Sequence, residues 1–290
     1  MIALTVGLAV FVGIALGLLG GGGSILTVPL LAYVGGMDAK QAIATSLLVV
    51  GVTSAVGAVS HARAGRVQWR TGLIFGAAGM AGAYAGGLLA RFIPGTVLLI
   101  GFAVMMIATA VAMLRGRRTV EAPREGHRLP VPKILAEGLV VGLVTGLVGA
   151  GGGFLVVPAL ALLGGLPMPV AVGTSLIVIA MKSFAGLGGY LSSVQINWTV
   201  ALAVTAAAVI GALIGARLTA KVNPDALRKA FGWFVLAMSS VILAQEIHVV
   251  VGVAAAAVTA AAALVTLACA RYAHCPLRRL AGGASRRAAA

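Results

Sequence analysis

The sequence predicts an all-α polytopic membrane protein with two inverted-topology repeats of about five hydrophobic segments each, plus one extra C-terminal helix. Three observations lead to this prediction: a very apolar composition, a long internal repeat, and basic residues concentrated in alternate loops. Of 290 residues, 61% are hydrophobic and 9% are charged, and the mean hydropathy is +1.11. Because a soluble domain carries about 25% charged residues, this chain could not cover its surface in water. A bundle of about ten spans of ~20 residues is expected instead.

Apolar runs separated by polar residues, or by Gly and Pro, define the predicted segments in chain order. They cover residues 2–19, 24–34, 39–60, 71–90, 95–114, 134–148, 153–164, 168–190, 199–216, 226–244 and 249–270. The predicted domains are a first repeat (1–114), a basic cytoplasmic linker (115–133), a second, inverted repeat (134–245), and an extra helix with a basic cytoplasmic tail (246–290). The short segments beside the glycine-rich stretches are expected to be broken or re-entrant helices, which would change the number of crossings but not their parity.

A duplication relates the two halves. Gly17–Leu47 and Gly146–Leu176 align without a gap, and 16 of the 31 positions are identical. The identities include a proline and a Thr-Ser pair, which shared low complexity does not explain. The difference in residue number between Gly17 and Gly146 is the same along the whole alignment, and we call it the repeat offset. It also carries Gly82 and Gly86 onto Gly211 and Gly215. These two Gly-x-x-x-Gly pairs are expected to serve helix packing, within the chain or between protomers.

The basic residues set the orientation of the repeats. The loop His61–Arg70 carries three arginines, whereas its counterpart Tyr190–Thr199 carries no charge. Because Lys and Arg are retained in cytoplasmic loops, these equivalent loops are expected on opposite faces of the membrane. All but three of the 21 Lys and Arg residues then lie inside, the exceptions being Lys40 and Arg91 outside and Lys182 within a span. The N-terminus is therefore predicted outside, and the C-terminus inside, the cell (cytoplasmic) membrane.

The sequence also argues against other classes of protein. A net charge of +15 would suit nucleic acid, but the basic clusters flank apolar runs and lack interleaved aromatic residues. Cys269 and Cys275 form neither a disulfide framework nor a metal cluster. The predicted spans hold no group of His, Cys and Glu at ligand or catalytic spacing. Neither an enzyme nor a metal or cofactor is expected.

The glycine-rich turns resemble those of a known family, the sulfite exporter TauE/SafE permeases. Each turn, Gly20–Ser24 and Gly149–Gly153, is followed by an apolar stretch with a proline, a Gly-Gly and an Ala/Gly-Thr-Ser-Leu motif. The resemblance covers both halves, roughly residues 5–245, while the final helix and arginine-rich tail fit it less clearly. It implies a proton-linked permease or exporter of sulfite, sulfonates or related small organic anions.

The glycine-rich turns are the first candidates for an anion-binding site. The segments that follow them would aim free backbone N–H groups inward, and helix N-termini bind anions because the donors and the dipole converge there. The alternative is that the glycines only form tight hairpins and packing contacts. The candidate substrate-binding residues of these turns are Gly21, Gly22, Gly23, Ser24, Gly151, Gly152 and Gly153.

Hydroxyl groups early on the third helix of each half are the second candidates. Thr45 and Ser46 in the first half, and Thr174 and Ser175 in the second, offer hydrogen-bond donors without the cost of burying charge. Their pairing within the repeat favours contact with the substrate. The alternative is that each hydroxyl bonds the carbonyl one turn earlier on its own helix, as is common in membrane helices.

Lys182 is the third candidate, as the one cation inside a predicted span. It shares a helical face with Ser175 and Gly186, and Thr53 holds the equivalent place in the first half. An ionisable group at this depth is a functional hypothesis by default. The alternative is that the long side chain snorkels to the membrane surface. Because no Asp or Glu is predicted in mid-membrane, a buried lysine favours an anionic substrate.

The predicted function is secondary transport of a small anion by alternating access, with proton coupling implied only by the resemblance. An anion channel, in which the same helix N-termini line a continuous pore, is one alternative. A non-transport membrane assembly subunit is another. The expected partners are the anionic substrate, protons, the lipid bilayer and, through the Gly-x-x-x-Gly faces, a second copy in a homodimer; nucleic acid is not expected.

Overall fold

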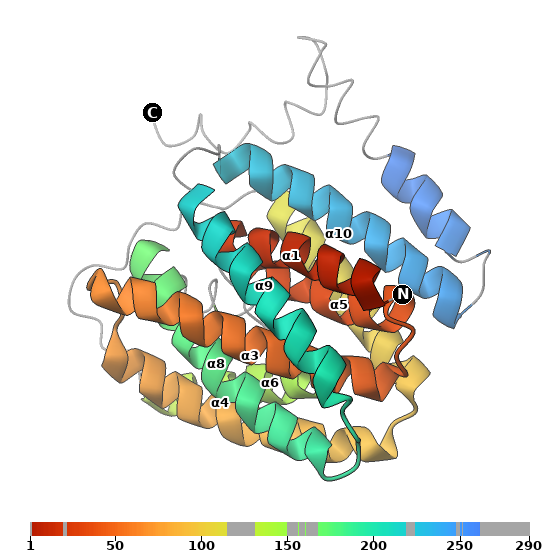
Figure 1. Cartoon of the computed structure of the whole chain (residues 1–290). Coiled ribbons are helices and arrows are strands. Elements are labelled where there is room, and N and C mark those ends of the chain that lie inside the picture. Colours follow the sequence, from red (N-terminus) through yellow and green to blue (C-terminus); the bar gives the residue numbers. More distant parts are fainter. Residues whose placement is uncertain are drawn as a thin grey trace, which may run out of the picture.

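The computed structural model describes residues 2–19, 22–114, 131–149, 168–218, 224–247 and 252–261, together with Val156, Leu160 and Val250. Every regular element in these ranges is a helix (Figure 1). The long helices are α1 (Ile2–Leu19), α3 (Ala39–Arg63), α4 (Trp69–Leu89), α5 (Gly95–Leu114), α6 (Val131–Val148), α8 (Met168–Leu191), α9 (Trp198–Leu218) and α10 (Pro224–Glu246). Four helices of the described part, at 39–63, 69–92, 170–191 and 198–218, are long and apolar enough to cross a membrane. The predicted polytopic α-helical fold is confirmed.

The ends of α3 show how the sequence sets the helix boundaries. Asp38 caps the start, because its side chain accepts a hydrogen bond of 3.2 Å from the backbone N–H of Lys40. At the other end, Gly65 adopts a φ of +67°, a conformation that glycine tolerates without strain. The backbone N–H of Arg66 then donates to the carbonyl of His61 at 2.9 Å and closes the turn.

The second segment of the first repeat is an irregular helix whose type changes along its length. It consists of a 3₁₀ turn η1 (Gly22–Leu26), a single α turn α2 (Thr27–Pro29) and a wider π turn η2 (Leu30–Val34). The π turn closes with a 2.9 Å hydrogen bond from the N–H of Gly35 to the carbonyl of Leu30. Residues 24–31 are buried in protein, as irregular backbone at membrane depth requires. The counterpart in the second repeat, 150–167, lies outside the described residues apart from Val156 and Leu160.

The two repeats are interleaved. Helix α1 of the first repeat packs along α9 of the second repeat. Helix α6 of the second repeat packs along α4 of the first repeat. Helix α4 is followed by the short 3₁₀ turn η3 (Ala90–Phe92). At both interfaces a Cβ added to glycine would overlap a backbone carbonyl of the facing helix, so only glycine allows this approach. The glycines concerned are Gly13, Gly17, Gly211 and Gly215 between α1 and α9, and Gly82, Gly86, Gly142 and Gly146 between α4 and α6. Both predicted Gly-x-x-x-Gly pairs therefore serve packing within the chain.

These contacts divide the core into two equivalent groups of helices. We call α1, α3 and α9 the first bundle, and α4, α6 and α8 the second bundle. Each bundle contains one helix from the other repeat, and the repeat offset carries the glycines of one interface onto those of the other. A pair of halves exchanged in this way cannot separate without opening both bundles.

Helices α3 and α8 are equivalent, lie side by side in the centre of the molecule and run antiparallel (Figure 1). A Cβ on Gly57 would touch the side chain of Leu176 at 3.4 Å, and a Cβ on Gly186 would touch the side chain of Leu47 at 3.4 Å. The repeat offset exchanges these two contacts, so a pseudo-two-fold axis passes midway between them, at the level of Val52 and Met181. Equivalent helices that run in opposite directions define an inverted repeat, and the predicted inversion is confirmed.

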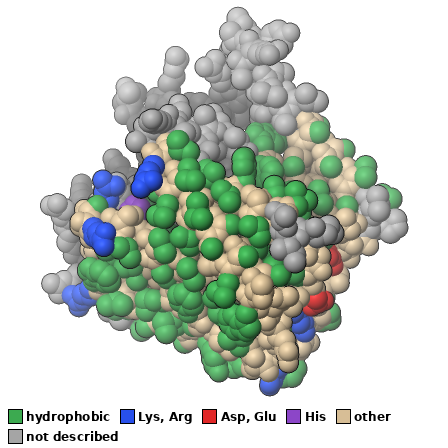
Figure 2. Space-filling model, in the orientation of Figure 1, with side chains coloured by type: hydrophobic (Ala, Val, Ile, Leu, Met, Phe, Trp, Pro, Cys, Tyr) green, Lys and Arg blue, Asp and Glu red, His purple; other side chains and the backbone are tan. Residues whose placement is uncertain are grey.

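The surface fits a lipid environment. Apolar side chains cover a broad band of the face in Figure 2. Lys and Arg gather at the end where α3 stops and α4 begins, while Asp and Glu appear at the opposite end together with further Lys or Arg (Figure 2). Large apolar side chains such as Phe11 (74% exposed) and Leu202 (59% exposed) also lie on the surface. A belt of this kind between polar ends is typical of a membrane protein.

Candidate functional site

Lys182 lies in the core of the second bundle. Its side chain extends from α8 and is 2% exposed, and its Nζ donates a hydrogen bond of 3.2 Å to the hydroxyl of Thr145 on α6. The aliphatic stem passes Gly79 of α4, where an added Cβ would lie 3.9 Å from the Cβ of Lys182. The end of α8, at Leu191, is about 14 Å further along the helix. The ammonium is therefore held inside the bundle instead of reaching the membrane surface.

Thr145 is oriented to receive the ammonium. Its hydroxyl donates to the carbonyl of Val141 at 2.7 Å, which leaves the oxygen free to accept from Lys182. Sequence reasoning missed Thr145 because its repeat equivalent is Leu16, so the duplication draws no attention to it. The signal that could have found it is a lone threonine among the apolar and glycine residues that follow Gly138 on α6.

The ammonium of Lys182 has more N–H donors than described acceptors. Lys carries three N–H donors, and within the described residues Thr145 is the one hydrogen-bond acceptor of Lys182. No Asp or Glu of the described part forms an ion pair with it. A buried cation without a counter-ion is costly, so this position is suited to an anion that arrives from solution.

The equivalent place in the first bundle is neutral. Thr53 is also buried, at 3% exposure, but its hydroxyl bonds the carbonyls of Val49 and Val50 on its own helix, at 2.7 and 3.2 Å. Leu16 stands where the second bundle has Thr145. Among the described residues, the second bundle has this cation site and the first bundle does not.

The hydroxyl pair of the first repeat meets the glycine turn of the second. Ser46 donates a hydrogen bond of 3.1 Å to the carbonyl of Gly149, the residue at the start of that turn. Gly149 has a φ of +72° and lies against Ile43, where a Cβ would overlap the side chain. The hydroxyl of Thr45 is buried and has no partner among the described residues. The two predicted motifs are thus brought together across the repeats.

The hydroxyl pair of the second repeat lies at the other end of the α3–α8 pair. The hydroxyl of Thr174 accepts a hydrogen bond of 2.9 Å from the backbone N–H of Gln68, in the loop between α3 and α4. Ser175 bonds the carbonyl of Val172 on its own helix at 2.8 Å. Since Thr174 and its equivalent Thr45 lie equally far from the pseudo-two-fold axis in opposite directions, the pairs are about 20 Å apart along the helices. They flank Lys182 from opposite sides and do not form one cluster.

The glycine-turn candidates are only partly described. Gly22 and Gly23 belong to the 3₁₀ turn η1, and Ser24 is fully buried behind them. Gly21, Gly151, Gly152 and Gly153 lie outside the described residues. Anion binding by the backbone N–H groups of these turns stays a prediction.

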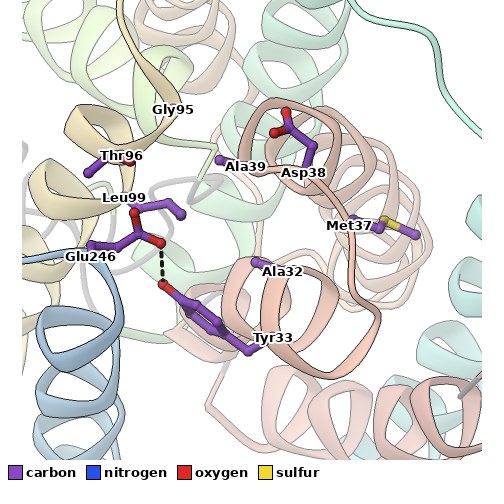
Figure 3. A pocket seen from close by; sticks show the side chains of 9 residues that line it. All are labelled: Ala32, Tyr33, Met37, Asp38, Ala39, Gly95, Thr96, Leu99 and Glu246. Atoms are coloured by element: carbon purple, nitrogen blue, oxygen red, sulfur yellow. Dashed lines mark hydrogen bonds between the residues drawn. The ribbon is translucent and has the colours of Figure 1, made fainter. Parts of the chain in front are cut away.

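A cavity that sequence reasoning missed lies between η2, the start of α3, the start of α5 and the end of α10 (Figure 3). Its volume is about 370 Å³, and its lining includes Tyr33, Asp38, Thr96 and Glu246. Tyr33 of η2 donates a hydrogen bond of 3.1 Å to Glu246 at the end of α10, which joins the first repeat to the second (Figure 3). Two carboxyl groups in one lining disfavour an anion, so this cavity is distinct from the site around Lys182.

The inverted repeat, the irregular glycine-flanked helix and the buried cation define a polytopic membrane protein of the transporter class. Residues 5–242 match the family described as sulfite exporter TauE/SafE, and the chain belongs to that family. The family resemblance based on the glycine-rich turns and the Thr-Ser motifs is confirmed.

Relatives carry matching names. A probable membrane transporter protein of Xylella fastidiosa (strain Temecula1) is 36% identical over 242 residues, which cover 81% of this chain and 92% of the relative. A probable membrane transporter protein of Methanocaldococcus jannaschii is 29% identical over 240 residues, covering 76% and 89%. The probable membrane transporter protein YunE of Bacillus subtilis is 29% identical over 229 residues, covering 71% and 84%. No solved structure matches the chain. The family and the names of these relatives indicate a multi-pass membrane transporter.

Proposed function

We propose that the protein is a secondary transporter that moves a small anion across the cytoplasmic membrane by alternating access. The substrate is sulfite, a sulfonate or a related organic anion, and transport is coupled to protons, as the family resemblance implies. The N-terminus lies outside and the C-terminus in the cytoplasm, because this orientation places the basic loops inside. The observation that carries the proposal is the buried ammonium of Lys182, which lacks an acidic partner in the described part of the chain.

The charge of Lys182 selects the sign of the substrate. A buried ammonium is stabilised when a bound anion supplies the opposite charge, and a charge-assisted hydrogen bond is roughly twice as strong as a neutral one. A cationic substrate would add repulsion at the same place. Thr145 holds the ammonium by one hydrogen bond, and the remaining N–H donors are available to a bound anion.

The position of Lys182 suits alternating access. It directly follows Met181, which lies at the level of the pseudo-two-fold axis, between the Ser46–Gly149 contact on one side and the Thr174–Gln68 contact on the other. Inverted repeats exchange their conformations when a transporter switches, so opening one contact while the other stays closed would expose Lys182 to each face in turn. In both states one cation serves as the shared binding point.

A transport assay tests this proposal. Purified protein in proteoliposomes would be given radiolabelled sulfite, sulfate, a sulfonate such as taurine, and acetate in parallel, with and without a pH gradient. We expect saturable uptake of at least one of these anions, trans-stimulated by the same unlabelled anion inside the vesicles. Non-saturable flux without counterflow would identify an anion channel instead. Liposomes that take up none of the anions faster than protein-free controls would contradict the proposed function.

A further inference from the structure

We infer that Ser54 and Ser183 form a second anion subsite, on the pseudo-two-fold axis between α3 and α8, for a small oxyanion such as sulfite or a sulfonate. The subsite rests on the transport function proposed above and adds a pair of neutral donors to the cation at Lys182. Ser54 lies on α3 and Ser183 lies on α8, and the repeat offset carries one onto the other.

Both serines are buried and unpaired. Ser54 is 1% exposed and Ser183 is 0% exposed. Neither hydroxyl has a hydrogen-bond partner among the described residues. A buried hydroxyl without a partner is unfavourable, and such groups are rare in native structures. Both copies of this duplicated position carry an unpaired buried hydroxyl, which indicates that the two hydroxyls have the same function.

Most other buried hydroxyls of the described helices find partners, Thr27 and Thr45 being the exceptions. Thr53, directly before Ser54, bonds the carbonyls of its own helix, and this local bond is open to any Ser or Thr in a helix. The described residues that use it include Thr109, Thr145, Ser175, Thr205, Ser239 and Ser240. Ser54 and Ser183 leave the local carbonyls unused, so their hydroxyls are available to a ligand.

The two hydroxyls face the same interface. Ser54 lies midway between Gly51 and Gly57, and a Cβ on these glycines would meet the Phe184 ring at 3.2 Å and the Leu176 side chain at 3.4 Å on α8. Residues three apart share a helical face, so Ser54 faces α8. A Cβ on Gly186 would meet Leu47 of α3 at 3.4 Å and the carbonyl of Ala83 of α4 at 3.5 Å, so the same spacing places Ser183 on the side of α8 that faces α3 and α4.

The serines are close enough to act together. They lie just beyond the level of the axis, in opposite directions, which separates them by about 6 Å along the helices. An oxyanion with three acceptor oxygens can accept one hydrogen bond from each helix across such a gap. Ser183 also follows Lys182 directly in the chain, so the pair adjoins the cation site. Neutral donors bind an anion more weakly than an ammonium does. Weak binding lets a transported anion leave the subsite again.

The test compares Ser54→Ala, Ser183→Ala and the double variant with wild type. The measurements are the half-saturation concentration for sulfite in proteoliposomes, and the melting temperature of purified protein with and without sulfite. We expect each single variant to raise half-saturation about fivefold to tenfold, because each removes one hydrogen bond to a charged ligand. The two effects should be similar in size, since the positions are equivalent. Without sulfite, melting should be unchanged or higher, because the unpaired hydroxyl is gone.

The matched control is Ser239→Ala. Ser239 is equally buried, at 1% exposure, but its hydroxyl bonds the carbonyl of Leu236 at 2.8 Å. Its removal should leave half-saturation unchanged. Single variants with wild-type half-saturation and wild-type stabilisation by sulfite would overturn the subsite while leaving the transport function intact. Lower melting temperature with unchanged half-saturation would assign both serines to packing and overturn it as well. Wild-type protein that neither transports sulfite, sulfate or taurine nor is stabilised by them would overturn the proposed function and the subsite together.

Discussion

The first and second bundles share one packing scheme and differ in one buried charge. Both pack a helix of one repeat against a helix of the other through glycines that tolerate no Cβ. At equivalent positions, however, the second bundle holds Lys182 and Thr145, whereas the first holds Thr53 and Leu16. Duplication and inversion therefore account for the scaffold, and the departure from symmetry accounts for the charge that selects an anion.

The difference between the bundles has a physical reason. A second lysine at the position of Thr53 would bury a second cation, which one monovalent anion could not neutralise. One central ammonium lets two symmetric half-paths share a single binding point. The polar groups that stay symmetric, such as Ser54 and Ser183, are neutral and can be duplicated at little cost.

The largest expected effect tests whether the scaffold is symmetric. We expect Gly82→Val in the second bundle and Gly211→Val in the first to abolish folded protein equally, because either side chain would overlap a backbone carbonyl of the facing helix. Gly7→Val and Gly101→Val are the controls, since an added Cβ at these sites has no described atom within 4 Å. The measurement is the yield of monodisperse protein in detergent. Normal yield for one of the two interface variants would show that the bundles do not pack equivalently.

The second prediction tests the inversion in the membrane. Single cysteines at Gly65 and Ser193, placed in a background with Cys269→Ser and Cys275→Ser, should react with an impermeant thiol reagent from opposite faces. The two positions lie in the equivalent loops that follow α3 and α8, which run antiparallel. Gly65→Cys is expected to react from the cytoplasmic side, because its loop carries three arginines. Reaction of both cysteines from one face is incompatible with inverted repeats.

The third prediction tests the local support of the cation. Thr145→Val keeps the shape of the side chain and removes the oxygen that accepts from Lys182. We expect the half-saturation concentration for the transported anion to rise about threefold to tenfold, because a hydrogen bond to a charged group contributes on the order of 1.5 kcal/mol. Thr53→Val is the matched change in the first bundle and should alter the half-saturation concentration less than about twofold. Equal effects in the two bundles would remove the proposed asymmetry.

The smallest effect is expected at the contact between Tyr33 and Glu246, outside both bundles. Tyr33→Phe removes one half-buried hydrogen bond, which should lower the free energy of unfolding by about 1 kcal/mol. Half-saturation should not change, because the cavity beside this contact is lined by carboxyl groups and is distinct from the site at Lys182. A large change in anion affinity would mean that the substrate path includes this cavity.

Much of the fold is predictable from the sequence. The repeat offset identifies the equivalent helices, and the arginines of the 61–70 loop predict their inversion. The exchange of helices between the bundles is not predictable in the same way, because a repeat shows which helices are equivalent but not which ones touch. The glycines Gly13 and Gly17 on α1 were the available signal, since they recur as Gly142 and Gly146.

The candidate site is less predictable than the fold. Lys182 is visible in the sequence as a lone charge in an apolar run, but its partner Thr145 is not, because it has no counterpart in the other half. The separation of Thr45 from Thr174 along the antiparallel α3–α8 pair depends on where the axis falls. Ser54 and Ser183 match at the repeat offset, but only the structure shows that their hydroxyls are unpaired.

The most direct test of this account is the affinity of Lys182→Met for the transported anion, at matched expression in proteoliposomes. Met keeps much of the apolar volume and removes the charge, so half-saturation should rise by a factor on the order of 10 or more, where tenfold corresponds to ~1.4 kcal/mol. Lys182→Arg should keep part of the affinity, because the charge remains while the geometry differs. Half-saturation equal to wild type in the Met variant would contradict the central claim that this buried ammonium binds the anion.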